Sequence, residues 1–237
     1  MHHYTILKGM NIVRSLALVV IMLACQEDTV VENNRGDIVG FVSLVDENGL
    51  AIQDAKGVTV TLDDGLTATT DGNGRFEFKN IAAGTYHPTY EKDGFGTMKK
   101  FNYLFTAGNV PGVLDVTNMV ELPSVKLLTK SVNVSGTALQ VSGTLEPTES
   151  FYLIFNLYDK ADAKPGEAIA SSGVTYCCGT TQVFIGSVYM PDSPTLYLGI
   201  YAVSMANQNS QFYYYDYEQS VGVNAAMKEL VAPFKVK

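Results

Sequence analysis

The sequence predicts an all-β fold made of two β-sandwich domains, and two observations lead to this prediction. From residue 37 onward, short runs of alternating hydrophobic and polar residues recur between clusters of Gly, Asn and Asp, as in strands separated by turns. Residues 25–237 number 213, which suits two domains of about 100 residues each.

Residues 1–24 are predicted to be a signal peptide that is removed from the mature chain. Arg14 precedes an apolar run, Leu16–Ala24, that is shorter than the ~20 residues a membrane-spanning helix needs. A basic start followed by a short apolar run is typical of secretory signals.

Leu23-Ala24-Cys25 resembles the lipobox of bacterial lipoproteins. The resemblance implies that Cys25 is acylated and begins the mature chain; the alternative is an ordinary signal peptide followed by a chance cysteine. The acidic pair Glu27-Asp28 resembles the surface-export signal of Bacteroidetes lipoproteins, which implies a lipid-anchored location at the outer membrane, on the cell surface.

The charge of the mature chain disfavours nucleic acid as a partner. Removal of Lys8 and Arg14 with the leader leaves 14 of the 16 basic residues against all 24 acidic ones, a net charge of −10. Binding to phosphates needs a basic surface. Residues 25–36 are polar and lack hydrophobic periodicity, so we expect them to be a tether.

Residues 37–129 are predicted to form the first sandwich. Its expected strands are Asp37–Asp46, Gly57–Leu62, Leu66–Thr70, Arg75–Lys79, Gly84–Glu91, Met98–Thr106 and Val113–Leu128.

Asp71-Gly72-Asn73-Gly74 raises the question of a calcium loop within this domain. Counted from Asp71, position 5 of such a loop is Arg75, position 6 is Phe76 and position 12 is Ala82, where an EF-hand needs an oxygen ligand, a Gly and a Glu. A guanidinium group does not ligate calcium. We therefore predict a tight turn between two strands.

Several separated motifs of this region keep a recognisable order along the chain. They are Gly40-Phe41-Val42, Asp46-Glu47-Asn48-Gly49, Thr69-Thr70-Asp71-Gly72-Asn73-Gly74-Arg75-Phe76, Ile81-Ala82-Ala83-Gly84-Thr85-Tyr86 and Lys92-Asp93-Gly94-Phe95. In that order residues 36–128 resemble a carboxypeptidase regulatory-like domain, a transthyretin-like β-sandwich common in Bacteroidetes surface proteins. The resemblance implies an accessory module without peptidase chemistry.

Residues 130–237 are predicted to form a second sandwich, immunoglobulin- or fibronectin-like by default, with a second transthyretin-like unit as the alternative. A loop is expected around Gly173 and Gly179. The expected strands are Val132–Val141, Phe151–Asp159, Gln182–Met190, Thr195–Met205, Gln211–Gln219 and Val231–Val236.

The sequence offers few residues from which an active site could be assembled. The mature chain has one histidine, His87, on which any Ser-His-Asp triad or histidine-rich metal site would depend. Asp63-Asp64 adjoins Gly65 and is typical of a turn, although a pair of carboxylates brought together by the fold would suit glycoside hydrolysis. We predict no catalytic residue, no cofactor and no metal site, and a hydrolase is the least favoured function.

Cys177 and Cys178 are neighbours in the sequence. Their Cα atoms lie about 3.8 Å apart, below the usual disulfide range of roughly 4.4–6.8 Å, so a vicinal disulfide would be strained. One alternative is a disulfide that makes the loop rigid and presents a surface for a ligand. The others, which are favoured, are a disulfide that only cross-links the loop and two unpaired thiols.

Tyrosines offer a candidate ligand surface. In Thr195–Met205, Leu198 and Ile200 share one face, and tyrosines share the other; in Gln211–Gln219, alternate residues are tyrosines. A short polar turn separates the two segments, so we expect them to pair as a hairpin. The alternative is ordinary cross-strand packing. The candidate residues are Tyr197, Tyr201, Tyr213, Tyr215 and Tyr217.

These observations favour a non-enzymatic surface lipoprotein that serves as a binding or accessory module for a glycan or a protein. The alternative is a structural pilus or adhesin subunit, because type V fimbrillins resemble this plan. In that family a protease cuts after an arginine before the first strand, which would correspond here to Arg35. Strand exchange between subunits would follow the cut.

Overall fold

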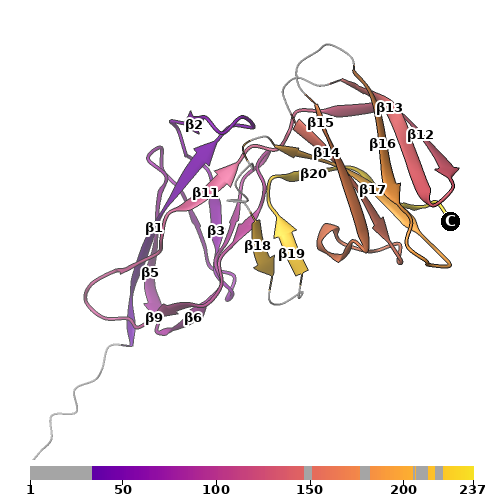
Figure 1. Ribbon diagram of the computed structural model, residues 1–237. Coiled ribbons are helices and arrows are strands. Elements are labelled where there is room, and N and C mark those ends of the chain that lie inside the picture. The colour runs from indigo at the N-terminus through magenta and orange to yellow at the C-terminus, as the bar shows by residue number, and fades with distance from the viewer. Residues whose placement is uncertain (1–33, 147–150, 177–181, 205, 207–212, 217–220) are drawn as a thin grey trace, which may run out of the picture. The chain divides into compact units, whose positions relative to one another are not determined.

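The computed structural model describes residues 34–146, 151–176, 182–204, 206, 213–216 and 221–237 (Figure 1). Across these ranges the chain is an all-β sandwich fold, as predicted, with a short 3₁₀ turn η1, Pro165–Glu167. No helix in the described ranges is long and apolar enough to cross a membrane. The predicted signal peptide and Cys25 lie outside the described residues.

Strand β1 (Arg35–Val45) organises the N-terminal sheets (Figure 1). It pairs in parallel with β10 (Gly112–Val113) and β11 (Thr117–Val120), and antiparallel with β2 (Ala51–Ile52) and β5 (Arg75–Ala82). A second sheet has the order β4-β3-β7-β8, and β6 pairs with β9. The bounds are β3 Thr59–Thr61, β4 Thr67–Thr69, β6 Gly84–Tyr86, β7 Thr89–Glu91, β8 Met98–Lys99 and β9 Tyr103–Phe105.

The N-terminal core forms because alternate residues of β1 point the same way. Ile38, Val42 and Leu44 are buried, and Gly40 between them leaves room for an aromatic ring, since a Cβ there would lie 2.4 Å from the Phe76 ring. Phe76 in turn packs edge-on against Tyr90 of β7, which joins the two sheets through one core.

The Asp71 segment is a turn, as predicted. Asp71 Oδ1 accepts hydrogen bonds from the backbone N–H groups of Asn73 and Arg75, both at 2.9 Å. Gly74 has a φ of +78°, and its N–H donates to the Asp71 carbonyl oxygen. The carboxylate is therefore used to close the hairpin.

Three long strands predicted in the N-terminal half are each divided in the structure. Gly84–Glu91 becomes β6 and β7, because Pro88 has no N–H to donate and the His87 N–H donates instead to Asp63. Met98–Thr106 becomes β8 and β9, with Asn102 at a φ of +60° between them. Val113–Leu128 is divided among β10, β11 and the start of β12.

The C-terminal strands form two sheets and a separate hairpin. One sheet has the order β12-β13-β16 and the other β15-β14-β17-β20; their seven strands suit the predicted immunoglobulin- or fibronectin-like sandwich. The hairpin β18–β19 is inserted between β17 and β20 in the sequence. The bounds are β12 Lys126–Ser135, β13 Ala138–Glu146, β14 Phe151–Tyr158, β15 Ala170–Tyr176, β16 Gln182–Tyr189, β17 Tyr197–Ser204, β18 Tyr213–Asp216, β19 Val221–Asn224 and β20 Met227–Lys235.

Two predictions about this half were wrong. Val132–Val141 is not one strand, because the chain turns at Gly136, whose φ is +60°, and β12 and β13 pair as a hairpin. Gly173 does not lie in a loop but in the middle of β15, opposite Ile154 of β14. A glycine is usual in turns, but pairing with a neighbouring strand decides its conformation here.

Residues Asn34–Lys237 form one compact unit. Within it the Ser204 hydroxyl of β17 donates a 2.6 Å hydrogen bond to the Glu47 carbonyl oxygen, which follows β1. The sheets before residue 121 and those after residue 125 share no strand pairing among the described residues. The boundary between residues 129 and 130 stays a prediction.

Candidate binding pocket

The candidate site lies on the outer face of the sheet β15-β14-β17-β20. Phe151, Leu153 and Phe155 of β14 are buried in the core between the two C-terminal sheets. The alternate residues of the same strand therefore face outward, and Tyr152 and Ile154 are only half-buried there. This face carries a pocket of about 610 Å³.

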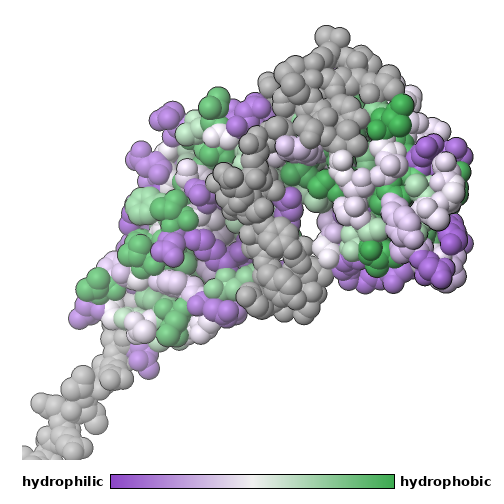
Figure 2. All heavy atoms as spheres, in the orientation of Figure 1, coloured by the Kyte–Doolittle hydropathy of each residue, from purple (hydrophilic) through white to green (hydrophobic). Residues whose placement is uncertain are grey.

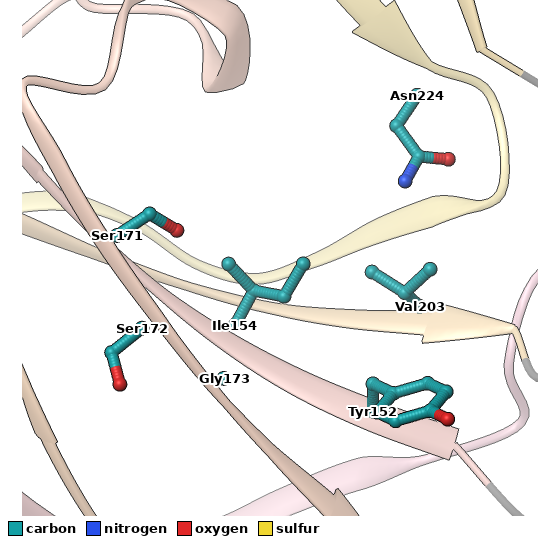
Figure 3. Close-up of a pocket in the computed structure, with 7 residues that line it drawn as sticks. All are labelled: Tyr152, Ile154, Ser171, Ser172, Gly173, Val203 and Asn224. Atoms are coloured by element: carbon teal, nitrogen blue, oxygen red, sulfur yellow. The ribbon is translucent and has the colours of Figure 1, made fainter. Parts of the chain in front are cut away.

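Three strands and the end of β19 line the pocket (Figure 3). The lining residues are Tyr152, Ile154, Ser171, Ser172, Gly173, Val203 and Asn224.

Strand register explains why these residues meet. Tyr152 of β14 is paired with Val203 of β17, so the two lie side by side across the sheet. Ile154 is paired with Gly173 of β15, and because glycine has no side chain the face is hollow beside Ile154. A Cβ at Gly173 would lie 4.0 Å from Ile154 Cγ1, so a side chain there would stand beside Ile154 in the hollow.

A buried network of hydrogen bonds lies beside the pocket. Asn156, the next outward residue of β14 after Ile154, accepts a 2.7 Å hydrogen bond from the Ser171 hydroxyl. Its Nδ2 donates to the Tyr158 hydroxyl oxygen at 3.1 Å and to the Pro165 carbonyl oxygen at 3.4 Å. The Tyr158 hydroxyl donates to that of Tyr201 at 3.0 Å. The network fixes the orientation of Ser171 at the pocket.

Burial keeps the two phenols of this network in their neutral form. Desolvation by burial raises the pKa of Tyr158 and the pKa of Tyr201. Among the described residues that line the pocket there is no Asp, Glu, Lys, Arg or His. The pocket therefore presents hydroxyl and amide groups beside apolar side chains, without formal charge on carboxylates or amines.

The predicted tyrosine surface is assembled only in part. Tyr197 and Tyr201 share the outward face of β17, as predicted, and contact the cluster around Tyr158. Tyr201 is only 1% exposed, so it is part of the network and not of a surface.

The predicted hairpin between the two tyrosine segments was wrong. Strand β17 pairs with β14 and β20, whereas β18 pairs with β19. The backbones of Tyr213 and Tyr215 lie in β18, and Tyr217 lies outside the described residues. The five tyrosines thus do not form one ladder across a single hairpin.

The other candidates lie elsewhere. The His87 ring nitrogen Nδ1 lies 3.0 Å from Asp63 Oδ2, which also accepts the His87 N–H, and Asp64 Oδ1 accepts the Leu66 N–H. Asp63 and Asp64 are thus turn residues. Cys177 and Cys178 fall outside the described residues. No group of three or more His, Cys, Asp or Glu suited to a metal ion occurs within the described ranges.

The sequence did not single out the pocket residues. Tyr152 lies in an apolar segment in which the alternation of residues places its side chain on the outward face of the strand. This alternation is the sequence signal that was available for the pocket. Ser171 and Gly173 belong to the β14–β15 pair and Asn224 to the β18–β19 hairpin, and the sequence does not indicate that these two strand pairs line one pocket.

Comparisons with known proteins do not assign the chain to a family. No family model matches it and no curated protein matches it. The resemblance to a carboxypeptidase regulatory-like domain therefore stays a resemblance.

Several solved structures are similar in part. A type II cohesin–X-dockerin complex from Acetivibrio cellulolyticus, a C-terminal interface mutant, is 26% identical over 35% of this chain, with a TM-score of 0.30. The match spans 56% of that chain, a little over half its length.

Two further structures match most of the chain at lower identity. A candidate carbohydrate-binding protein from Bacteroides uniformis is 13% identical, covers 85% of this chain and 98% of its own, and has a TM-score of 0.38. The major pilin subunit of Bacillus cereus is 14% identical, covers 85% and 68%, and has a TM-score of 0.32. These TM-scores are low, so the fold assignment depends on the topology of this chain itself.

Proposed function

We propose that this protein is a non-enzymatic binding protein, held at the outer-membrane surface by lipid on Cys25, whose ligand occupies the pocket on the outer face of β14. The observation that carries the proposal is the pocket itself, lined by Tyr152, Ile154, Ser171, Gly173 and Asn224 among others. A concave site that mixes apolar surface with a few polar groups is the usual form of a ligand site.

The chemistry of the lining supports binding and not catalysis. The serine on the pocket face of β15, Ser171, donates its hydroxyl proton to Asn156 Oδ1, which is not a base. His87, the only histidine after residue 3, is hydrogen-bonded to Asp63 in the N-terminal half and does not line the pocket.

The pilus alternative has less support. Strand exchange needs an accessible sheet edge, and β12, β16, β15 and β20 are the edge strands of the two C-terminal sheets among the described residues. Two of these four edges carry features that oppose strand addition: a bulge between Leu127 and Thr129 in β12, and Pro233 in β20. Arg35, after which the cut would fall, is paired with Ala82 and donates to the Asn80 carbonyl oxygen at 2.6 Å.

Anchoring is tested by the N-terminus of protein extracted from the cell surface. More than one acyl chain, at about 0.8 kcal/mol per buried methylene, gives stable attachment to a membrane. We expect incorporation of a fatty-acid probe that is lost in a Cys25→Ser variant. An unlabelled chain would overturn the anchor, and a chain that begins at Gly36 would favour the pilus alternative.

Binding is tested with the mature chain on an array of oligosaccharides and by capture of labelled surface proteins. A Gly173→Val substitution places a side chain in the hollow beside Ile154, and we expect it to abolish binding of the ligand. A Gly72→Ala substitution, where a Cβ would lie 3.4 Å from Asp54 Oδ1, serves as the control far from the pocket in sequence. Equal binding by both variants would exclude the pocket as the site.

A further inference from the structure

We infer that the pocket binds an uncharged sugar residue, with the apolar face of the sugar ring against Tyr152 and its hydroxyl groups toward Ser171 and Asn224. This inference rests on the proposed function, because it names the ligand class of the same site. Three properties of the pocket carry it: its apolar wall, its polar wall and its lack of charge.

The apolar wall is continuous across two strands. Tyr152 and Val203 are register partners on β14 and β17, and Ile154 follows Tyr152 on the same outward face (Figure 3). A sugar ring has one face of C–H groups and a rim of hydroxyls. A tyrosine side chain is complementary to such a sugar ring, because its flat apolar ring packs against the C–H groups and its hydroxyl can form a hydrogen bond with a sugar hydroxyl.

The polar wall contains one hydroxyl and one amide group. The Ser171 hydroxyl gives its proton to Asn156 Oδ1 and is therefore an acceptor, and Asn224, whose Oδ1 accepts the Ala226 N–H, carries an NH₂ donor. Ser172 also borders the pocket, but it is paired with the core residue Phe155, so its side chain lies on the opposite face of the sheet. Sugar hydroxyls also donate and accept, so such groups can satisfy them without a charge. Ser171 is oriented by its bond to Asn156.

The lack of charge selects among sugars. The lining residues that the structure describes include no Lys, Arg or His that could pair with a carboxylate, sulfate or phosphate group. The whole chain has a net charge of −8, which repels polyanions further. A neutral glycan therefore fits better than a uronate-containing or sulfated one, or a charged peptide.

The size of the pocket is compatible with this ligand. At about 610 Å³ it falls within the roughly 300–1,000 Å³ typical of small-molecule sites.

Titration calorimetry with the mature chain tests the inference. The probes are neutral oligosaccharides (gluco-, manno- and xylo-oligomers) and, as matched acidic probes, oligogalacturonates and sulfated chondroitin oligomers. We expect at least one neutral series to bind and the acidic series not to bind.

Two substitutions at one position separate the ring from the hydroxyl. Tyr152→Ala should weaken binding of the neutral sugar about tenfold or more, because it removes the apolar platform, whereas Tyr152→Phe should weaken it less than about threefold. Tyr189→Ala is the matched control, since Tyr189 is 67% exposed on β16 of the other sheet and should leave the affinity unchanged. Thermal melting of each variant shows whether it is folded at the assay temperature.

The outcomes separate the inference from the proposed function. Neutral-sugar binding that depends on Tyr152 supports both. Binding of an acidic glycan or a protein that Gly173→Val abolishes overturns the inference and keeps the proposed function. Neutral-sugar binding that survives Tyr152→Ala and Gly173→Val overturns the assignment to this pocket. If the chain binds none of these ligands, both the inference and the proposed function are overturned.

Discussion

The Nζ atom of Lys130 lies 3.7 Å from the centre of the Phe234 ring. Lys130 belongs to β12 and Phe234 to β20, so this cation–π contact joins the edge strands of the two C-terminal sheets. Lys130 is paired with Gly143, where a Cβ would collide with the core ring of Phe184, so the lysine stands on the inner side of its sheet. A charged side chain pointing inward from an edge strand discourages pairing with another chain.

We therefore expect Lys130→Val to promote self-association. The substitution removes the inward charge and leaves a ten-residue edge strand with exposed Leu128 and Val134. Sedimentation velocity over a range of concentrations should show dimers or larger species for this variant and a constant distribution for the native chain.

Lys235→Val is the matched control for this experiment. Lys235 is an exposed lysine at the end of β20, and its loss changes the net charge equally without freeing β12. Self-association of both variants to the same extent would show that overall charge, and not the position of Lys130, keeps the chains apart.

The network beside the pocket should contribute measurably to stability. In Tyr158→Phe, the Asn156 amide loses its 3.1 Å acceptor and the Tyr201 hydroxyl loses its donor. Leaving buried polar groups unpaired costs about 1–3 kcal/mol. Tyr201→Phe leaves the Tyr158 O–H without its acceptor and breaks one hydrogen bond, whereas Tyr158→Phe breaks two, so we expect the larger loss of stability for Tyr158→Phe. Urea unfolding of the two single variants and the double variant measures the coupling, and strictly additive effects would show that the two hydroxyls do not depend on each other.

A turn glycine offers a test of the N-terminal hairpin. In Gly74→Ala the new Cβ would lie 2.1 Å from the Val42 carbonyl oxygen at a φ of +78°, so both space and backbone conformation oppose it. We expect a loss of stability of about 2 kcal/mol or more, measured by denaturant unfolding. Gly72→Ala in the same turn should change stability much less, and a similar loss in both variants would mean that the turn as a whole tolerates no side chain.

The hydrophobic periodicity predicted the strands but not their partners. Leu198 and Ile200 face the core and Tyr201 the opposite side, as their alternation indicates. Periodicity assigns residues to faces, but pairing depends on contacts far away in the sequence. The short polar turn predicts that β17 pairs with the next tyrosine-rich segment, whereas its partners are β14, about 45 residues earlier, and β20, which lies beyond an inserted hairpin.

The pocket was out of reach of sequence reasoning for the same physical cause. Its hollow exists because Gly173 stands opposite Ile154, and that register follows from the pairing of β14 with β15. Taken alone, a glycine near Cys177-Cys178 indicates a loop. The Asp71 turn was predictable because every group that closes it lies within five residues.

An exposed ionic cluster gives a prediction for acid stability. Lys79 Nζ donates to Asp37 Oδ2 at 2.8 Å and to Glu77 Oε1. The hydrogen bond from Lys79, followed by one from the Asn80 N–H, lowers the pKa of Asp37 below its ordinary value of 3.8. Hydrogen bonds from Lys79 and then Arg75 lower the pKa of Glu77 below 4.5, and the two carboxylates raise the pKa of Lys79 above 10.5.

The sign of the effect follows from these directions. A carboxyl group with a lowered pKa in the folded state stabilises the protein above its ordinary pKa, and this contribution is lost as the pH falls through the lowered value. The raised pKa of Lys79 adds stability that is complete below pH 10.5 and is lost only at higher pH.

The melting temperature of the native chain should therefore fall as the pH drops below about 4.5, and that of Lys79→Met should fall less over the same range. Because the cluster is exposed, added salt should narrow the difference between the two chains. Parallel melting curves at all pH values would show that the cluster contributes nothing to acid stability.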